Sequence, residues 1–190
     1  MKKFSEKTAA AVLGKMLRAA QKEPRESLRY AWIDSAGRQC CCDGFRAYRL
    51  NKPVPNLPDM PAHLSGIALD RIYPDKKGLR EITLPALDDV KAICAADRAN
   101  KSEPRRNQFP LGEGLPVVNP LYLRDMMQLF PDARCYVGAA FGAVLFTSQH
   151  GDGLICPIRT NNTSPRQIPS KAAPSVPVYS AAQFAARYAA

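Results

Sequence analysis

Proline and glycine divide this 190-residue chain into short segments, and the division limits what it can fold into. The chain has 17 prolines and 11 glycines, and proline is excluded from the interiors of helices and central strands. Segments long enough for helices remain at 5–22, 86–99 and 120–130. The other apolar segments are short and end at turn residues, as antiparallel strands do. Hydrophobic residues form 46% of the chain, enough for a core, so we expect one α+β domain.

The order of the expected elements repeats along the chain. Strands are predicted at 28–34, 38–50, 64–72, 79–84, 115–118, 134–137, 143–147 and 154–158. A strand-helix-strands pattern thus occurs once within 4–84 and again within 115–159, which indicates a duplicated unit. We expect the two helices of these units to lie side by side on one face of an antiparallel sheet. The helix at 86–99 and the charged loop after it form an insertion at about 85–110.

The first expected helix separates a basic face from an apolar one. At about 100° per residue, Lys7, Lys15, Arg18 and Lys22 fall within an arc of roughly 80°. No acid interrupts this arc, whereas ordinary exposed helices intersperse Glu with Lys. The opposite side is apolar and consists of Val12, Leu13, Met16, Leu17 and Ala20. The basic face is either a phosphate-contacting surface or simply a solvated one.

Small residues at positions 11 and 14 lie within the basic arc and would let a phosphate backbone approach closely. The helix at 120–130 has a more mixed polar face, on which Arg124 is a weaker candidate for a DNA contact. There, a solvated face explains the pattern equally well.

The formal charge of +10 favours association with polyanions such as nucleic acid or an anionic membrane.

No segment approaches the roughly 20 consecutive apolar residues that cross a bilayer, and no secretory leader is evident at the N-terminus. We therefore expect a cytoplasmic protein that is not held in a membrane.

No catalytic or metal-binding pattern is evident, and we expect neither an enzyme nor a cofactor. The six cysteines contain no CxxC pair, and the two histidines, His63 and His150, lack metal-ligand spacing to them. Buried strand thiols explain the cysteines better than zinc. Asp88 and Asp89 suit a helix start, and Asp43 with Gly44 suits a turn or bulge.

Three segments, taken in order, resemble the bacterial DNA polymerase III sliding clamp family, including compact versions from phages and mobile elements. Residues 42–47 (Cys-Asp-Gly-Phe-Arg-Ala) are similar to that family's Thr-Asp-Gly-His-Arg-Leu strand. Residues 118–127 resemble the strand-to-helix entry of a clamp domain's second half. Residues 155–159 (Ile-Cys-Pro-Ile-Arg) are similar to its closing Met-Pro-Met-Arg strand.

The resemblance implies a clamp-like domain over 1–160, followed by a flexible Pro/Ala-rich tail at 161–190. In the family, such domains form a ring, and basic helices lining its bore track duplex DNA without reading bases. The resemblance thus implies a processivity or DNA-tethering accessory that forms homo-oligomers and works with a polymerase or other replication protein. The alternative is an adaptor that has this fold but binds a replication or phage protein instead of DNA.

Overall fold

The computed structural model describes residues 3–160. The tail expected at 161–190 lies outside the described residues, and so does the short helix that the sequence suggests near 181–188. Within residues 3–160, no helix combines the length and apolar character that a membrane span requires.

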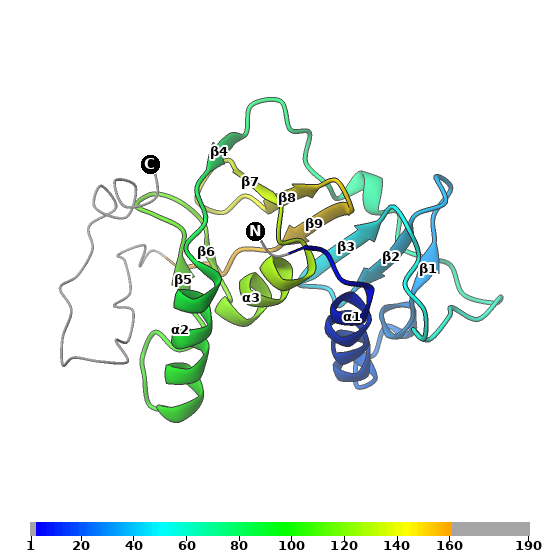
Figure 1. Cartoon of the computed structure of the whole chain (residues 1–190), viewed down its shortest axis with the longest axis horizontal. Helices are drawn as coiled ribbons and strands as arrows, with labels where there is room; N and C mark the ends of the chain where they lie inside the picture. The colour runs from blue at the N-terminus through cyan, green and yellow to red at the C-terminus, as the bar shows by residue number, and fades with distance from the viewer. Residues whose placement is uncertain (1–2, 161–190) are drawn as a thin grey trace.

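A seven-stranded antiparallel sheet forms the centre of the fold, in the order β1-β2-β3-β9-β8-β7-β4 (Figure 1). Its strands are β1 (Trp32–Ile33), β2 (Gln39–Cys42), β3 (Arg46–Leu50), β4 (Arg80–Ile82), β7 (Arg134–Val137), β8 (Val144–Ser148) and β9 (Gly151–Ile155). A separate hairpin pairs β5 (Phe109–Pro110) with β6 (Val117–Val118). Strands β3 and β9 meet at the middle of the sheet, with Arg46 opposite Ile155 and Leu50 opposite Gly151.

Helices α1 (Glu6–Ala20) and α3 (Pro120–Leu129) contact each other and lie on the same face of this sheet (Figure 1). Each is followed by three strands of the sheet, β1 to β3 after α1 and β7 to β9 after α3. Helix α2 (Leu87–Ala99) packs against α3 on the side away from α1. The α+β class with an antiparallel sheet is therefore confirmed, together with all three expected helices.

The ends of the two helices follow local signals. The hydroxyl of Ser5 accepts a hydrogen bond from the backbone N–H of Thr8 at the start of α1. The side chain of Asn119 accepts one from Leu121 N at 2.9 Å, and Pro120 occupies the first position of α3. Both are favoured N-terminal arrangements, because they satisfy or remove backbone donors that have no partner within the helix.

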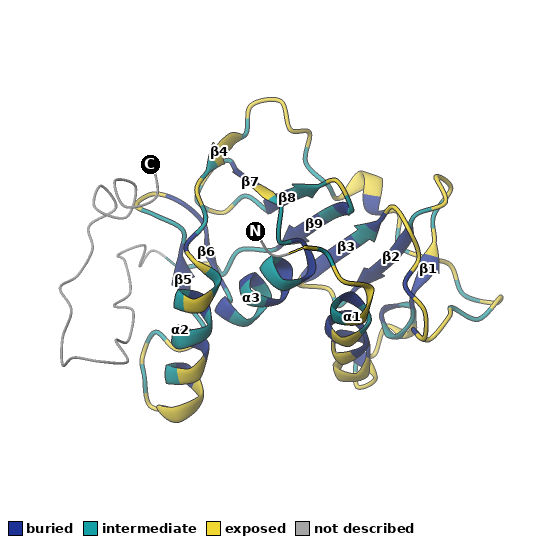
Figure 2. Cartoon of the chain, in the orientation of Figure 1, coloured by how far each residue is buried: buried dark blue, intermediate teal, exposed yellow. Residues whose placement is uncertain are grey.

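The main core lies between the helices and the sheet, where Figure 2 shows mostly buried residues. At its centre α3 approaches β9 very closely. A Cβ added to Gly153 would lie 2.1 Å from Sδ of Met126, so the Met126 side chain would have to move to admit even a methyl group. A smaller apolar cluster on the opposite face of the sheet includes Trp32 and Leu154 and is covered in part by Leu69.

Several strand predictions were wrong in position or type. The segment predicted as a strand at 28–34 contains a 3-10 turn at Glu26–Arg29 and only the two-residue strand β1. The single strand predicted at 38–50 is two strands, because the carboxylate of Asp43 accepts hydrogen bonds from Phe45 N and Arg46 N and closes a turn.

The segment at 64–72 is not a strand. It contains a 3-10 turn at Leu69–Arg71. Buried Leu69 and partly buried Ile67 cover the second apolar cluster, whereas Ile72 is exposed. The last predicted strand, 154–158, ends at Ile155, and Pro157 separates it from an isolated bridge between Ile158 and Val117.

Candidate nucleic-acid interface

The four cations of the predicted basic face, Lys7, Lys15, Arg18 and Lys22, are all exposed on α1 or just beyond its end. We call this set the α1 basic face. The residues predicted to lie opposite it are all buried: Val12, Leu13, Met16, Leu17 and Ala20. In Figure 2 the outward side of α1 is correspondingly exposed.

None of the ion pairs found within residues 3–160 involves the α1 basic face. Those pairs use Lys91 and arginines 38, 46, 49, 124 and 134. The charge of α1 is therefore not balanced by acids in contact with it. Such cations are available to an external anion.

Gly14 does not provide the open approach that the sequence suggested. It is buried, and a Cβ added to it would lie 3.8 Å from Leu57 and 3.3 Å from the Arg18 guanidinium. Ala11 remains exposed within the basic face.

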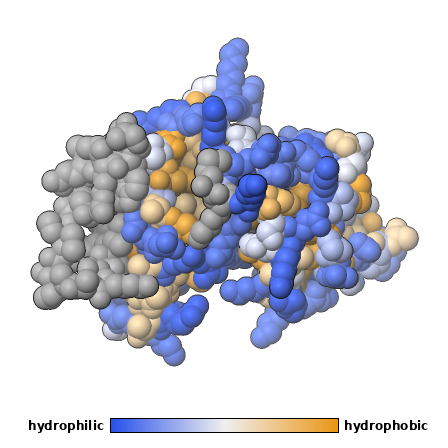
Figure 3. All heavy atoms as spheres, viewed as in Figure 1, coloured by the Kyte–Doolittle hydropathy of each residue, from blue (hydrophilic) through white to orange (hydrophobic). Residues whose placement is uncertain are grey.

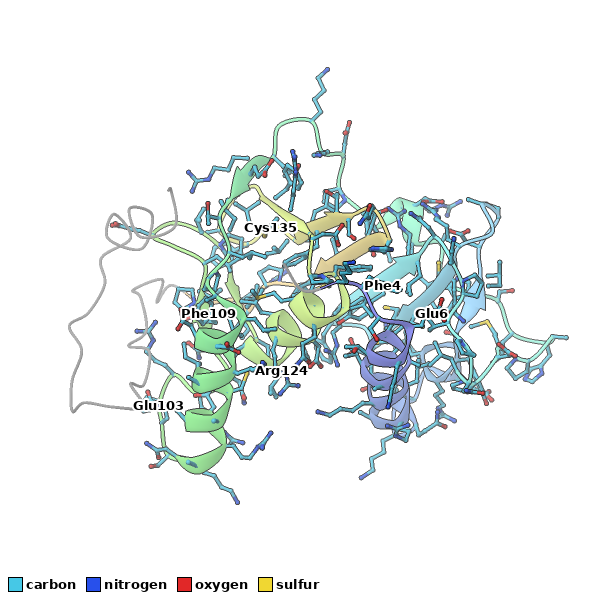
Figure 4. The ribbon with its side chains drawn as sticks, viewed as in Figure 1. Phe4, Glu6, Glu103, Phe109, Arg124 and Cys135 are labelled. Carbon is cyan, nitrogen blue, oxygen red and sulfur yellow. The ribbon has the colours of Figure 1, made fainter. Side chains whose placement is uncertain are left out.

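Arg124 lies in a different environment from the α1 cations. Its side chain is only 14% exposed and donates to Oδ1 of Asp125, through Nε at 2.9 Å and through Nη2. Much of its charge is thus compensated within the protein. In Figure 4 it lies beneath α3, in the space between α1 and α2.

A buried charge network surrounds Asp125. Its second oxygen, Oδ2, accepts a hydrogen bond from Nη1 of Arg46 at 2.7 Å, and Arg46 also donates from Nε to Asp43 at 2.9 Å. The guanidinium of Arg46 lies 4.4 Å from the ring centre of Tyr122. Burial, and next the Asp43 carboxylate, raise the pKa of Tyr122, so its phenol is neutral at physiological pH.

A second network neutralises cations on the opposite face of the sheet. Arg49 pairs with Asp152 at 3.1 Å and with Asp70 at 2.6 Å, and Asp70 also pairs with Arg38. Arg38 in turn pairs with Asp34. Acids therefore balance Arg38 and Arg49 on that face, whereas no ion pair within residues 3–160 involves the α1 basic face. Sequence reasoning missed both networks, because the pairs that join their segments, such as Arg46 with Asp125 and Arg49 with Asp152, are far apart in the chain.

The helical face is hollowed between α1 and α2. Figure 3 shows a notch in the lower margin of the molecule between these two helices, bordered by hydrophilic side chains. Helix α3 lies between them, in contact with both.

No group of three His, Cys, Asp or Glu side chains is arranged to hold a metal ion within residues 3–160.

The thiols are poorly suited to nucleophilic chemistry. Burial raises the pKa of Cys42 to about 11 and that of Cys40 to about 12. A pocket of about 390 Å³ beside β1 is lined by Trp32 and Leu64, with Asp59 as the ionisable side chain in its lining. A single carboxylate is not a catalytic pair.

Comparison of the chain with protein-family models, with curated proteins and with solved structures finds no match in any of the three.

Proposed function

We propose that this protein binds duplex DNA through its helical face, independently of sequence, as a sliding-clamp-like accessory for processivity or tethering. The observation that carries the proposal is the α1 basic face. Its four cations are exposed, point away from the core and lie outside every ion pair found in residues 3–160.

Lysine and arginine on such a face contact phosphates, which are the same at every base pair. The nearest amide side chain, Gln21, donates to the backbone carbonyls of Leu17 and Arg29. It is therefore engaged within the protein and not presented to base edges. Binding of this kind is non-specific and sensitive to salt.

The resemblance to sliding clamps extends the proposal to assembly. Several copies would close edge to edge, with β1 at one end of the sheet of each copy and β4 at the other. The ring would act in the cytoplasm and hold a polymerase or another replication protein at the DNA. Arg124 would contribute a weaker, partly compensated phosphate contact beneath α3.

The DNA-binding test measures duplex affinity against salt for wild type and for the double variant Lys15→Ala/Arg18→Ala. Wild type should bind unrelated duplexes equally, and log affinity should fall linearly with log salt. Each contacting cation that is removed should lower the slope by about 1. The fold should persist, because both side chains are exposed.

A matched control, Lys76→Ala/Arg134→Ala, removes the same charge elsewhere. Lys76 lies 3.9 Å from the ring centre of Tyr136, and Arg134 alternates with buried Cys135, so both lie on the face without helices. This control should leave the slope unchanged. If both double variants lowered the salt slope equally, net charge alone would drive binding. If Lys15→Ala/Arg18→Ala kept the duplex affinity and salt slope of wild type, the alternative of an adaptor that binds a protein instead of DNA would be favoured.

Assembly is tested separately by solution mass with and without circular DNA. If the protein forms a ring, it should stay bound to closed circular DNA at a salt concentration at which it dissociates from the same DNA in linear form. A monomeric mass under both conditions would contradict the ring and leave only a tethering module.

A further inference from the structure

An exposed aromatic side chain is held rigidly on the helical face, in the turn between β2 and β3. Phe45 is 55% exposed, yet its backbone is fixed from both sides. Its N–H donates to the Asp43 carboxylate at 3.0 Å, and its carbonyl accepts from Cys156 N at 2.8 Å. Gly44 before it has φ +86°, a conformation that glycine adopts readily.

The ring of Phe45 belongs to a small aromatic platform. It stacks on Tyr122 at the start of α3, with ring centres 6.4 Å apart and planes 26° apart. Tyr122 is itself supported by the guanidinium of Arg46, which the carboxylates of Asp43 and Asp125 hold in place. The platform is thus anchored in the buried charge network, while the Phe45 ring remains open to a ligand.

An exposed arginine lies beside the turn that carries this platform. A Cβ added to Gly44 would lie 2.6 Å from Nη2 of exposed Arg25, so that guanidinium lies beside the turn. Arg25 is also only three residues beyond Lys22 of the α1 basic face. An aromatic ring with an exposed arginine beside it suits a ligand that combines a flat ring with phosphate.

We propose that the Phe45–Tyr122 platform stacks an unpaired nucleobase, so that the protein prefers DNA in which a duplex passes into a single strand. The inference rests on the proposed function, since the α1 basic face would hold the duplex phosphates next to the platform. Base–aromatic stacking is tolerant of sequence because every base has a flat π-face. The preference therefore concerns the structure of the DNA and not its sequence.

The test uses the full chain and two probes, a blunt duplex and the same duplex extended by a single strand. Wild type should bind the extended duplex at least about fivefold more tightly than the blunt duplex. This factor is the lower end of the affinity gain expected from stacking one base. Phe45→Leu should abolish this preference and leave blunt-duplex affinity unchanged. Phe45→Trp should retain it, because the flat ring is kept.

A second readout reports stacking directly. The fluorescence of 2-aminopurine placed at the first unpaired position should be quenched by wild type and by Phe45→Trp, but not by Phe45→Leu. The control is Phe141→Leu, since Phe141 is equally exposed, at 56%, and lies in the loop before β8. This control should behave as wild type does in both measurements.

The outcomes separate the two proposals. Salt-dependent duplex binding without a preference for the extended probe, or a preference that survives Phe45→Leu, would overturn the stacking site and leave the proposed function standing. Absence of binding to either probe would overturn both. The platform would then be a contact for a protein, which Phe45→Leu should weaken.

Discussion

Arg46 and Asp125 join the two helix-and-strands units of the fold, 79 residues apart in the chain, through a 2.7 Å hydrogen bond from Nη1 to Oδ2. Their side chains are 8% and 6% exposed. The bond ties the turn before β3 to the middle of α3, and therefore also positions Tyr122 and the aromatic platform. A buried pair of this kind specifies an arrangement more surely than it adds net stability.

Removing the carboxylate of Asp125 should be strongly destabilising. Asp125→Ala leaves Arg46 and Arg124 without their shared partner, and removing one member of a buried pair typically costs about 3–5 kcal/mol. We expect the lower end of this range, since Asp43 still pairs with Arg46. Urea unfolding followed by circular dichroism measures the change.

The control for this variant is Lys91→Ala, which breaks an exposed pair with Asp88 at 2.9 Å. Exposed pairs contribute about 0–1 kcal/mol, so the free energy of unfolding should hardly change. If Asp125→Ala were as mild as Lys91→Ala, the pair with Arg46 would not organise the fold.

The close approach of α3 to β9 predicts that even one methyl group at position 153 is harmful. In Gly153→Ala the new Cβ would overlap the Met126 side chain, whose Sδ would lie 2.1 Å away. Overpacking of this kind typically costs about 1–3 kcal/mol. Thermal unfolding should show a clear loss of stability.

A double-mutant cycle identifies the cause of that loss. Met126→Ala alone opens a cavity and should cost about 2–5 kcal/mol, but it also makes room for the methyl at position 153. The double variant should therefore lose less stability than the sum of the two single variants. Strictly additive losses would mean that Gly153 is required for its backbone conformation and not for space.

The six thiols should differ sharply in reactivity. Cys156 is half-buried, whereas the other five cysteines are buried. Burial raises the pKa of Cys42 to about 11 and also raises that of Cys156, so thiolate is scarce in the native protein at pH 8. Ellman's reagent should react with Cys156 first and with all six thiols only after denaturation.

The assignment is checked with Cys156→Ser, which should remove the fast phase and leave the slow ones. Fast labelling of the cysteines in β2 under native conditions would show that this strand opens far more readily than its burial implies.

Asp132 predicts a pH-dependent contribution to stability. Burial opposes its ionisation, but the Ser148 hydroxyl at 2.6 Å and the Gln149 N–H at 3.2 Å outweigh burial and lower the pKa of the carboxyl. Because the pKa of this carboxyl is lower in the folded state than in the unfolded state, its ionised form stabilises the fold at any pH above the unfolded-state pKa. This stabilisation is lost as the pH falls through the folded-state pKa.

The Tm of wild type should therefore exceed that of Asp132→Asn at pH 7, and the difference should shrink below about pH 4. A difference that stayed constant down to about pH 2 would mean that the carboxylate charge contributes nothing, and that only the shape of the side chain matters.

Features encoded within a few neighbouring residues could be predicted from the sequence. Ser5 and Asn119–Pro120 mark the starts of α1 and α3, and the apolar period of α1 identifies its buried side. The exposed arc of cations follows from the same periodicity. An amphipathic face depends on local spacing, which is why the buried side of α1 was predicted correctly.

Features that depend on distant partners could not be predicted in this way. The segment at 64–72 has the apolar character of a strand, but it covers the sheet from outside instead of pairing with it. The buried ion pair joins Arg46 to Asp125, 79 residues away in the chain. The aromatic platform likewise joins a turn and a helix start from the two halves of the chain.

The physical reason is the range of the interactions. Helix caps, helical periodicity and the turn at Asp43 arise from hydrogen bonds and side-chain spacing over three or four residues, and they can be recognised in the sequence alone. Which cations are neutralised and which stay available depends on ion pairs and burial between segments far apart in the chain. Folding brought distant acids to Arg38, Arg46 and Arg49, whereas no ion pair within residues 3–160 involves the α1 basic face.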